Sequence, residues 1–181
     1  MKTIERFFKW LKSMKFWKVF LLALAFLFVW SFLVGGTLYL CGVEFSQNVA
    51  PSEQFFVNSL FLVPFCAYIE EVMFRWIPML VLSFILMWMY RSGRLNKERF
   101  FVVEKYAILI LTIVSSVVFG WVHGNVFNVL IQGVSGTVFM LLYLRIFFIR
   151  RDKGLRNRWQ LLSLAEAGLI HTSSNLVLMI L

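Results

Sequence analysis

Ionisable side chains stand inside three apolar stretches of this chain. The only two histidines of the sequence, His123 and His171, each lie within such a stretch. A third stretch carries Glu70 and Glu71, and Arg75 follows Glu71 by four residues. On the most lenient insertion scale, an ionisable group in hydrocarbon costs about 2.5–3.5 kcal/mol. These residues therefore indicate a site whose chemistry or structure depends on them.

The acidic stretch contains one pair that can neutralise itself and one acid that cannot. Glu71 and Arg75 are spaced i, i+4 with the acid first, the favourable order for an ion pair on a helix. Glu70 points about 100° away from Glu71 and has no local partner. A carboxylate enclosed in a low-dielectric cavity suits the role of a general base or acid. For this group taken alone, the alternative is a structural ion-pair network between helices.

Each histidine has a notable neighbour one helical turn away. His171 and Asn175 share one helix face, so both side chains can donate to a developing oxyanion or bind a metal in one cavity. The alternative for them is interhelical hydrogen bonding. His123 follows Phe119 by four residues and precedes Gly124, which indicates a tight turn or a helix end. The alternative for His123 is a single hydrogen bond to a carbonyl near that helix end.

Polar residues also recur at helical spacing on both sides of the His123 turn. The two stripes are Thr112, Ser116 and His123 before the turn, and Asn128, Gln132 and Ser135 after it. The second stripe either lines the same cavity or provides packing polarity, helped by Gly133 and Gly136 as close-approach residues.

The composition is that of a membrane protein. Of 181 residues, 61% are hydrophobic, whereas a soluble domain has roughly 45–50%. No alternating strand pattern is present, and lipid admits only helices or closed barrels. We therefore expect an all-α fold, a polytopic transmembrane bundle of five to six membrane helices that binds the lipid bilayer and leaves no room for a separate soluble domain.

The net charge of +9 comes from clusters that border the apolar stretches. All basic residues except Arg75 belong to three clusters: Lys2, Arg6, Lys9, Lys12, Lys15, Lys18; Arg91, Arg94, Lys97, Arg99, Lys105; and Arg145, Arg150, Arg151, Lys153, Arg156, Arg158. This positive-inside pattern places the N-terminus and all three clusters in the cytoplasm. It argues against nucleic acid as a partner and fits a bacterial inner membrane.

The apolar stretches predict the order of the spans. An uncleaved signal-anchor helix is expected at 16–41, and later spans at 106–122, 126–148 and 159–181, with the C-terminus outside. The stretch 55–90 is too long for one span of about 20 residues. Because Pro64 and Pro78 interrupt it, we expect a broken or strongly tilted helix, or a span followed by a shorter helix. The chain divides into an N-terminal part, 1–54, and a core, 55–181.

The order of the motifs is more specific than any one of them. Glu-Glu-x-x-x-Arg ends at Arg75, Phe-x-x-x-His ends at His123, and His-x-x-x-Asn ends at Asn175. This set resembles the CAAX protease and bacteriocin-processing (CPBP) family of intramembrane proteases, also called the Abi family, which is related to the type II CAAX prenyl endopeptidases. The run 132–136 is similar to the family's helix between its second and third motifs, and the resemblance covers roughly 55–181.

The resemblance implies an intramembrane endopeptidase whose partner is a membrane-associated peptide or small-protein substrate. The implied catalytic residues are Glu70, Glu71, His123, His171 and Asn175, with Arg75 and Phe119 as structural support. Glu70, assisted by His123, is expected to deprotonate the water that attacks the scissile carbonyl. His171 and Asn175 are expected to stabilise the oxyanion. Glu71 and Arg75 are expected to hold the motif helix and tune Glu70.

The cofactor stays open at this point. Glu70, His123 and His171 are candidate ligands of a divalent metal such as Zn²⁺ with an open coordination position. There is no His-Glu-x-x-His motif, and the family's relatives have been interpreted both as metalloproteases and as metal-independent glutamate proteases.

Two other classes of function stay open beside the protease. One is a non-catalytic protein of the same fold, for bacteriocin self-immunity or as a membrane scaffold, in which the same residues form a structural network. The other is a small transporter, which also keeps acids and histidines in the membrane.

Two geometric expectations follow. A single site requires the three motifs to lie within about 10 Å of one another, so the helix before His123 must tilt or begin nearer Phe100. Glu166, near the cytoplasmic end of the last span, is expected to face water or lipid headgroups.

Overall fold

The chain forms a bundle of helices. The computed structural model describes residues 6, 9–10, 12–43, 53–124, 126–152 and 159–180, and within them there is no strand. The elements in chain order are α2 (Phe16–Leu40), α3 (Glu53–Glu71), η1 (Val72–Trp76), α4 (Ile77–Arg91), α5 (Lys97–Val122), α6 (Val126–Asn128), η2 (Val129–Gly133), α7 (Val134–Asp152) and α8 (Trp159–Ile180). The two short segments η1 and η2 are π-helical turns.

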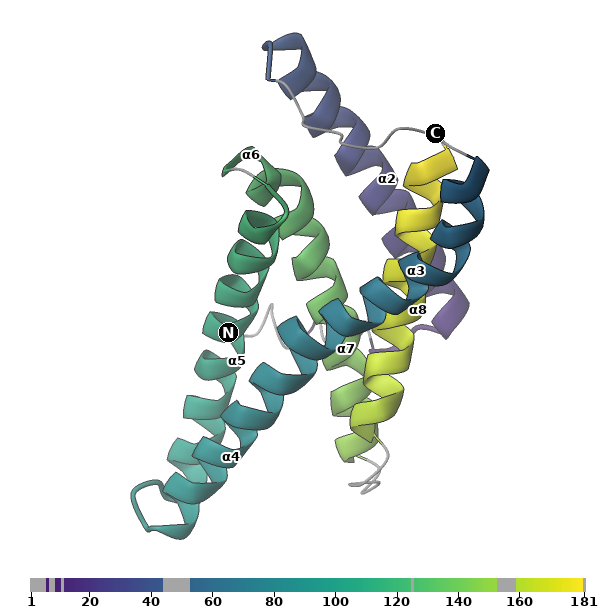
Figure 1. Ribbon diagram of the computed structural model, residues 1–181. Helices are drawn as coiled ribbons and strands as arrows, with labels where there is room; N and C mark the ends of the chain where they lie inside the picture. The colour runs from purple at the N-terminus through teal and green to yellow at the C-terminus, as the bar shows by residue number, and fades with distance from the viewer. Residues whose placement is uncertain are drawn as a thin grey trace.

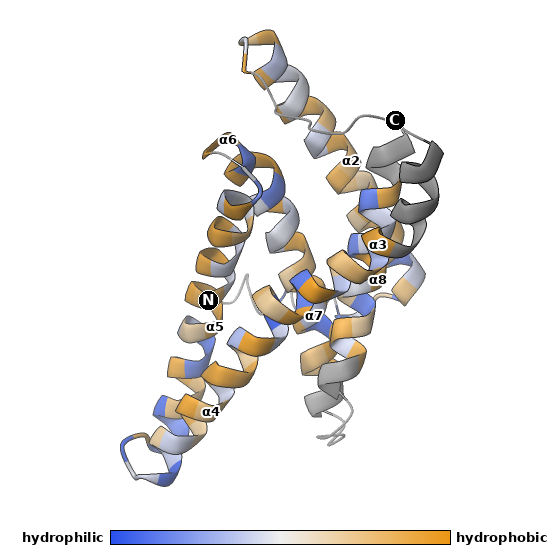
Figure 2. Ribbon diagram, viewed as in Figure 1, coloured by the Kyte–Doolittle hydropathy of each residue, from blue (hydrophilic) through white to orange (hydrophobic). Residues whose placement is uncertain are grey.

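Four helical stretches are long and apolar enough to cross a membrane. They are Phe16–Leu40, Leu62–Arg91, Lys97–Val122 and Val126–Ile149. Figure 2 shows apolar residues along the helices, with hydrophilic residues at the α4–α5 loop and in the middle of the bundle. The expected all-α membrane bundle is therefore confirmed, while the membrane's identity and the side on which the N-terminus lies stay predictions.

The long apolar stretch around Pro64 and Pro78 is one continuous, tilted helical rod. Helix α3 passes through Pro64 without ending, and it continues through η1 into α4. At 1.5 Å per residue, the rod is about twice as long as the ~30 Å hydrocarbon core is thick. In Figure 1 it crosses the other helices diagonally. The stretch is therefore neither broken nor divided into a span and a separate shorter helix, and its tilt relative to a membrane stays a prediction.

Helix α5 and the π-turn η2 approach each other closely because glycine lies at their contact. A Cβ added at Gly120 would lie 2.6 Å from the Cα of Val129 and 2.8 Å from the backbone nitrogen of Gly133. A Cβ added at Gly133 would in turn lie 3.0 Å from the carbonyl oxygen of Ser116. Small residues let membrane helices pack backbone against backbone. This contact fixes the turn that carries His123.

Helix α2 is attached to the core at two levels. Its buried residues Val19, Ala23 and Leu27 pack against Phe139 and Ile170 of α7 and α8, with Leu142 in the same cluster. Further along, the indole nitrogen of Trp30 donates to the carbonyl oxygen of Leu130 in η2 at 2.7 Å. The N-terminal helix thus belongs to the same packed unit as the rest of the chain.

A second buried ion pair corrects two sequence-based expectations. Arg145 Nη1 lies 2.6 Å from Glu166 Oε1, and the two side chains are 5% and 9% exposed. The other guanidinium nitrogen, Nη2, donates to the carbonyl oxygen of Met14 at 2.6 Å. Glu166 therefore does not face water or headgroups, and Arg145 is not one of the flanking cytoplasmic charges. The pair joins α7, α8 and the segment before α2, and sequence spacing gives no sign of a partner 21 residues away.

The Arg145–Glu166 pair yields a stability prediction. Glu166→Ala leaves the Arg145 guanidinium buried without its carboxylate, so we expect a loss of about 3–5 kcal/mol in the free energy of unfolding. Unfolding in mild detergent, followed by circular dichroism, measures it. Glu98→Ala is the control because Glu98 is exposed in the first turn of α5, where an acid contributes about 0.3–1 kcal/mol. Equal effects of the two substitutions would contradict a structural role for the pair.

The α5–η2 contact yields a second prediction. Gly120→Ala places a methyl group inside backbone that cannot move without separating the two elements, so we expect destabilisation of about 1–3 kcal/mol or more. Gly36→Ala on α2 is the matched control, because a Cβ there meets nothing within 4 Å. That control should be neutral or slightly stabilising, since alanine favours helix by about 1 kcal/mol over glycine. Thermal unfolding of both variants in the same detergent makes the comparison.

Candidate active site

Residues from three separate helices meet in the middle of the bundle. Glu70 and Glu71 lie at the end of α3, His123 directly follows α5, and His171 lies within α8. Glu70 Oε1 lies 3.7 Å from His123 Nε2, and Glu70 Oε2 lies 3.3 Å from His171 Nε2. The three motifs thus satisfy the ~10 Å condition for a single site. The tilt of the α3–α4 rod and the early start of α5 at Lys97 make this convergence possible.

The inner layer of the site is fully buried and carries opposite charges. Arg75 Nη1 lies 3.0 Å from Glu71 Oε1, and both side chains are 0% exposed. His171 Nδ1 lies 2.9 Å from the same Glu71 oxygen, and its side chain is 2% exposed. The i, i+4 pair expected from the sequence is therefore present. Its carboxylate also contacts a residue exactly one hundred positions away, which only the fold brings near.

Aromatic rings enclose the Arg75 guanidinium. Its central carbon lies 4.5 Å from the centre of the Phe119 ring and 5.5 Å from that of Phe139. Such cation–π contacts are worth most where water is excluded. Arg75 Nη2 also donates to the carbonyl oxygen of Gly136 at 3.5 Å. A Cβ at Gly136 would come within 3.3 Å of that nitrogen and 3.0 Å of the Phe119 ring, so glycine leaves the space that arginine occupies.

Both ring nitrogens of His171 face carboxylates. Nδ1 faces Glu71 and Nε2 faces Glu70, and an ionised carboxylate can only accept a hydrogen bond. Phe139 stacks on the imidazole, with ring centres 4.3 Å apart and planes at 23°. Because each ring nitrogen is directed at a carboxylate, His171 suits holding the acids in place rather than contacting a substrate.

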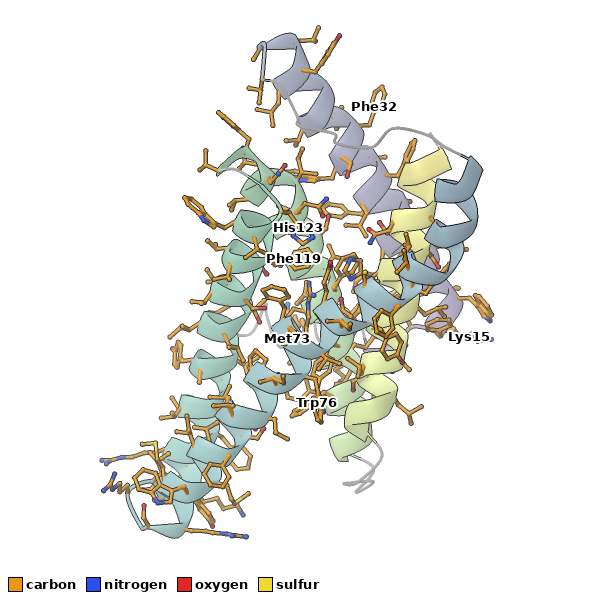
Figure 3. All side chains as sticks on the ribbon, viewed as in Figure 1. Lys15, Phe32, Met73, Trp76, Phe119 and His123 are labelled. Atoms are coloured by element: carbon orange, nitrogen blue, oxygen red, sulfur yellow. The ribbon has the colours of Figure 1, made fainter. Side chains whose placement is uncertain are left out.

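The outer layer consists of Glu70 and His123, and it is accessible. Their side chains are 27% and 28% exposed. His123 Nδ1 lies 2.6 Å from the carbonyl oxygen of Phe119, and because a carbonyl only accepts, Nδ1 carries the proton. The other ring nitrogen, Nε2, faces Glu70. Figure 3 shows Phe119 and His123 toward the α6 end of the bundle, beyond Met73 and Trp76.

The turn after α5 holds His123 in position. The expected helix end is confirmed: α5 ends at Val122 and Gly124 has φ +142°, a conformation that favours glycine. Asn128 Nδ2 donates to the carbonyl oxygen of His123 at 2.6 Å. A Cβ at Gly124 would lie 2.6 Å from that nitrogen. Asn128, a residue of the second predicted stripe, thus holds the backbone at His123.

Three polar side chains of α5 and α8 make no hydrogen bond to the acids or histidines of the site among the described residues. Asn175 lies half-buried one turn after His171, and within the described residues its amide makes no hydrogen bond to the acids or histidines. The hydroxyl of Thr112 donates to the carbonyl oxygen of Ile108 in its own helix at 2.8 Å. The buried hydroxyl of Ser116 has no hydrogen-bond partner among the described residues. On α5, it is Ser115, Phe119 and His123 that contact the rod carrying the acids.

Sequence reasoning missed several residues around the site. Phe139, Ser115 and Trp30 each contact an element far away in the chain. The chain contains 21 phenylalanines, so no feature of its own distinguishes Phe139. Gly136 was predicted to be a close-approach residue, and the group that lies close to it is the guanidinium of Arg75.

The candidate metal ligands are close together but are not arranged as a metal site. In the described part of the chain, no group of three or more His, Cys, Asp or Glu side chains could hold a metal ion. Of the three candidates, His171 already contacts a carboxylate through each ring nitrogen. The buried Oε2 atom of Glu70 lies 3.3 Å from His171 Nε2 without a hydrogen bond to any described residue, and Oε2 of Glu71 likewise has none. They retain capacity to accept from a water or a substrate N–H.

No family model, characterised protein or solved structure matches this chain.

The inner layer yields a prediction about stability. Arg75→Met leaves the Glu71 carboxylate buried with reduced compensation, so we expect a loss of about 3–5 kcal/mol. In the double variant Arg75→Met/Glu71→Gln, both charges are gone, and we expect about 1–3 kcal/mol of this loss to be recovered. The free energy of unfolding in detergent is measured for wild type, both single variants and the double variant, which together form a double-mutant cycle. Strictly additive effects would show that the two side chains do not depend on each other.

Proposed function

We propose that the chain is an intramembrane endopeptidase similar to the CPBP family. The observation that carries the proposal is the two-layer site: the accessible pair Glu70 and His123 stands in front of the buried group Glu71, Arg75 and His171. A purely structural network has no need of an accessible acid–base pair whose atoms face each other across 3.7 Å. The three motifs also occur in the family's order.

The proposed chemistry is hydrolysis by an activated water. A water in contact with Glu70 Oε1 and His123 Nε2 would attack the scissile carbonyl carbon while Glu70 accepts its proton. When the tetrahedral intermediate collapses, the C–N bond breaks and the same proton passes to the leaving amine. The buried residues behind Glu70 fix its position before the reaction, which lowers the cost of reaching the transition state. No step requires a metal.

The stabilisation of the oxyanion is assigned to Asn175. His171 was expected to share this role, but its ring nitrogens are directed at the two glutamates. Asn175 lies one turn further along α8 and is half-buried, and a side-chain amide is a suitable oxyanion donor. His171 is accordingly assigned to holding Glu70.

The proposed substrate is a membrane-associated peptide or small protein. The site lies among helices that are apolar enough to cross a membrane, so a substrate has to reach it from the bilayer or from its surface. The basic clusters that border the helices suit a bacterial inner membrane, with the N-terminus in the cytoplasm.

The proposal predicts that Glu70→Gln lowers peptide cleavage by about 10²–10⁴-fold, the usual contribution of a general base. The amide keeps the size of the side chain but cannot accept the proton of water. The protein, reconstituted in liposomes, is incubated with a quenched-fluorescence peptide library, and the products are identified by mass spectrometry. Glu98→Gln, an exposed acid on α5, is the control and should cleave as wild type does.

Metal-stripped protein should retain its activity in the same assay.

Equal products from wild type and Glu70→Gln would overturn the protease proposal. They would instead favour the non-catalytic alternative, bacteriocin self-immunity or a membrane scaffold, in which the polar cluster serves only to hold the helices together.

A further inference from the structure

A stripe of three residues on α5 contacts the rod that carries the acids. Ser115, Phe119 and His123 are spaced by four residues, so they lie on one face of the helix. Ser115 Oγ donates to the carbonyl oxygen of Phe74 at 2.5 Å. The Phe119 ring meets the Phe74 ring edge to face, with centres 5.3 Å apart, and His123 faces Glu70. The stripe therefore connects the π-turn η1 to the site.

The hydrogen bond of Ser115 differs from those of other hydroxyls in the bundle. Among the described residues, the hydroxyl groups of Thr37, Thr112, Ser135, Thr137 and Ser173 donate to the carbonyl four residues earlier in the chain. This is the ordinary choice for serine and threonine in a helix. Ser115 instead donates to a carbonyl 41 residues away.

Pro78 explains why the Phe74 carbonyl needs an outside donor. In a regular α-helix, the carbonyl of Phe74 accepts from the backbone N–H of residue 78, and proline has none. The preceding turn widens into η1, in which the N–H of Ile77 donates to the carbonyl of Val72, five residues earlier. A carbonyl freed in this way inside a membrane has to be satisfied by a neighbouring helix. Ser115 supplies that donor.

The π-turn sets the direction of the acids relative to α4. Helix α4 is anchored by buried residues such as Met79, which packs in one cluster with Ile108 of α5. Glu70 and Glu71 lie on the other side of the turn. One extra residue in a turn changes the direction of a side chain by about 100°. If η1 relaxed to a regular helix while α4 stayed in place, the carboxylates would turn away from the histidines.

We propose that Ser115 is a positioning residue of the acidic pair: its hydroxyl holds η1 against α5 and thereby keeps Glu70 and Glu71 directed at His123 and His171. The catalytic consequence rests on the function proposed above, whereas the positioning itself does not. Ser115 does not touch the reacting atoms.

The two histidines permit a test that does not depend on catalysis. Because the chain has only two, protein labelled with ¹⁵N-histidine gives imidazole signals that a single His123→Gln variant assigns. These signals report the protonation and hydrogen bonding of each ring, and hence its contact with the glutamates. We expect Ser115→Ala to shift the signals of both rings. Ser115→Thr keeps a hydroxyl and should restore them.

The adjacent serine provides a matched control. Ser116 is as buried as Ser115, and its hydroxyl has no hydrogen-bond partner among the described residues. Ser116→Ala should leave both imidazole signals as in wild type. If Ser115→Ala also leaves them unchanged, or if both alanine variants shift them equally, the positioning role is wrong.

A variant at Pro78 tests whether this proline is the reason that the Phe74 carbonyl needs the Ser115 hydroxyl as a donor. Pro78→Ala restores the N–H that the Phe74 carbonyl lacks, so the shift caused by Ser115→Ala should be smaller in this background. If Ser115→Ala fails to fold alone, the comparison of Pro78→Ala with Pro78→Ala/Ser115→Ala decides the matter. If Ser115→Ala shifts the imidazole signals equally in the wild-type and Pro78→Ala backgrounds, the Ser115 hydroxyl does not replace the N–H that Pro78 lacks.

The same variants separate this proposal from the proposed function. In the peptide assay, Ser115→Ala should lower kcat by about ten- to a hundredfold, the effect of a small misplacement of catalytic groups, and leave KM nearly unchanged. Shifted imidazole signals with no cleavage by wild type would support the positioning role and overturn the protease. Unshifted imidazole signals in Ser115→Ala, together with cleavage by wild type, would support the protease and overturn the positioning role.

Discussion

The contact on which the rest of the structure depends is the buried group of Glu71, Arg75 and His171. A charge enclosed in the bundle is tolerable only if opposite charges and hydrogen bonds compensate it. Here the compensation comes from one turn of the same helix and from a helix near the other end of the chain. The group therefore fixes the position of α8 against α3, and it leaves Glu70 as the acid that faces outward.

Close helix packing around this group is achieved by small residues and by backbone irregularity. Gly136 leaves room for the arginine, and Gly120 lets α5 contact η2 through backbone. The two π-turns occur where α3 meets α4 and where α6 meets α7, and such turns are frequent at functional sites. Because lipid tails provide no hydrophobic force between helices, shape and hydrogen bonding have to provide the specificity.

The sequence predicted local features better than contacts between helices. The helical spans, the end of α5 at His123 and the Glu71–Arg75 pair followed from spacing and hydropathy alone. The environment of Glu166 was predicted wrongly, because its partner Arg145 stands beside a cluster of flanking charges and looks like one of them. The contact of Ser115 with Phe74 was not predicted, since serines occur at both 115 and 116 and only the partner helix distinguishes them.

What the sequence by itself determined is an all-helical membrane bundle with a compensated acid–base pair and two histidines inside it. These properties depend on residue type and on spacing within single helices. Only the tertiary structure decided which nitrogen faces which carboxylate, which acid is accessible and which serine holds the π-turn. The physical reason is that the direction of a side chain changes by about 100° with each residue. One extra residue in a turn therefore redirects a site without changing the hydropathy from which the helices are predicted.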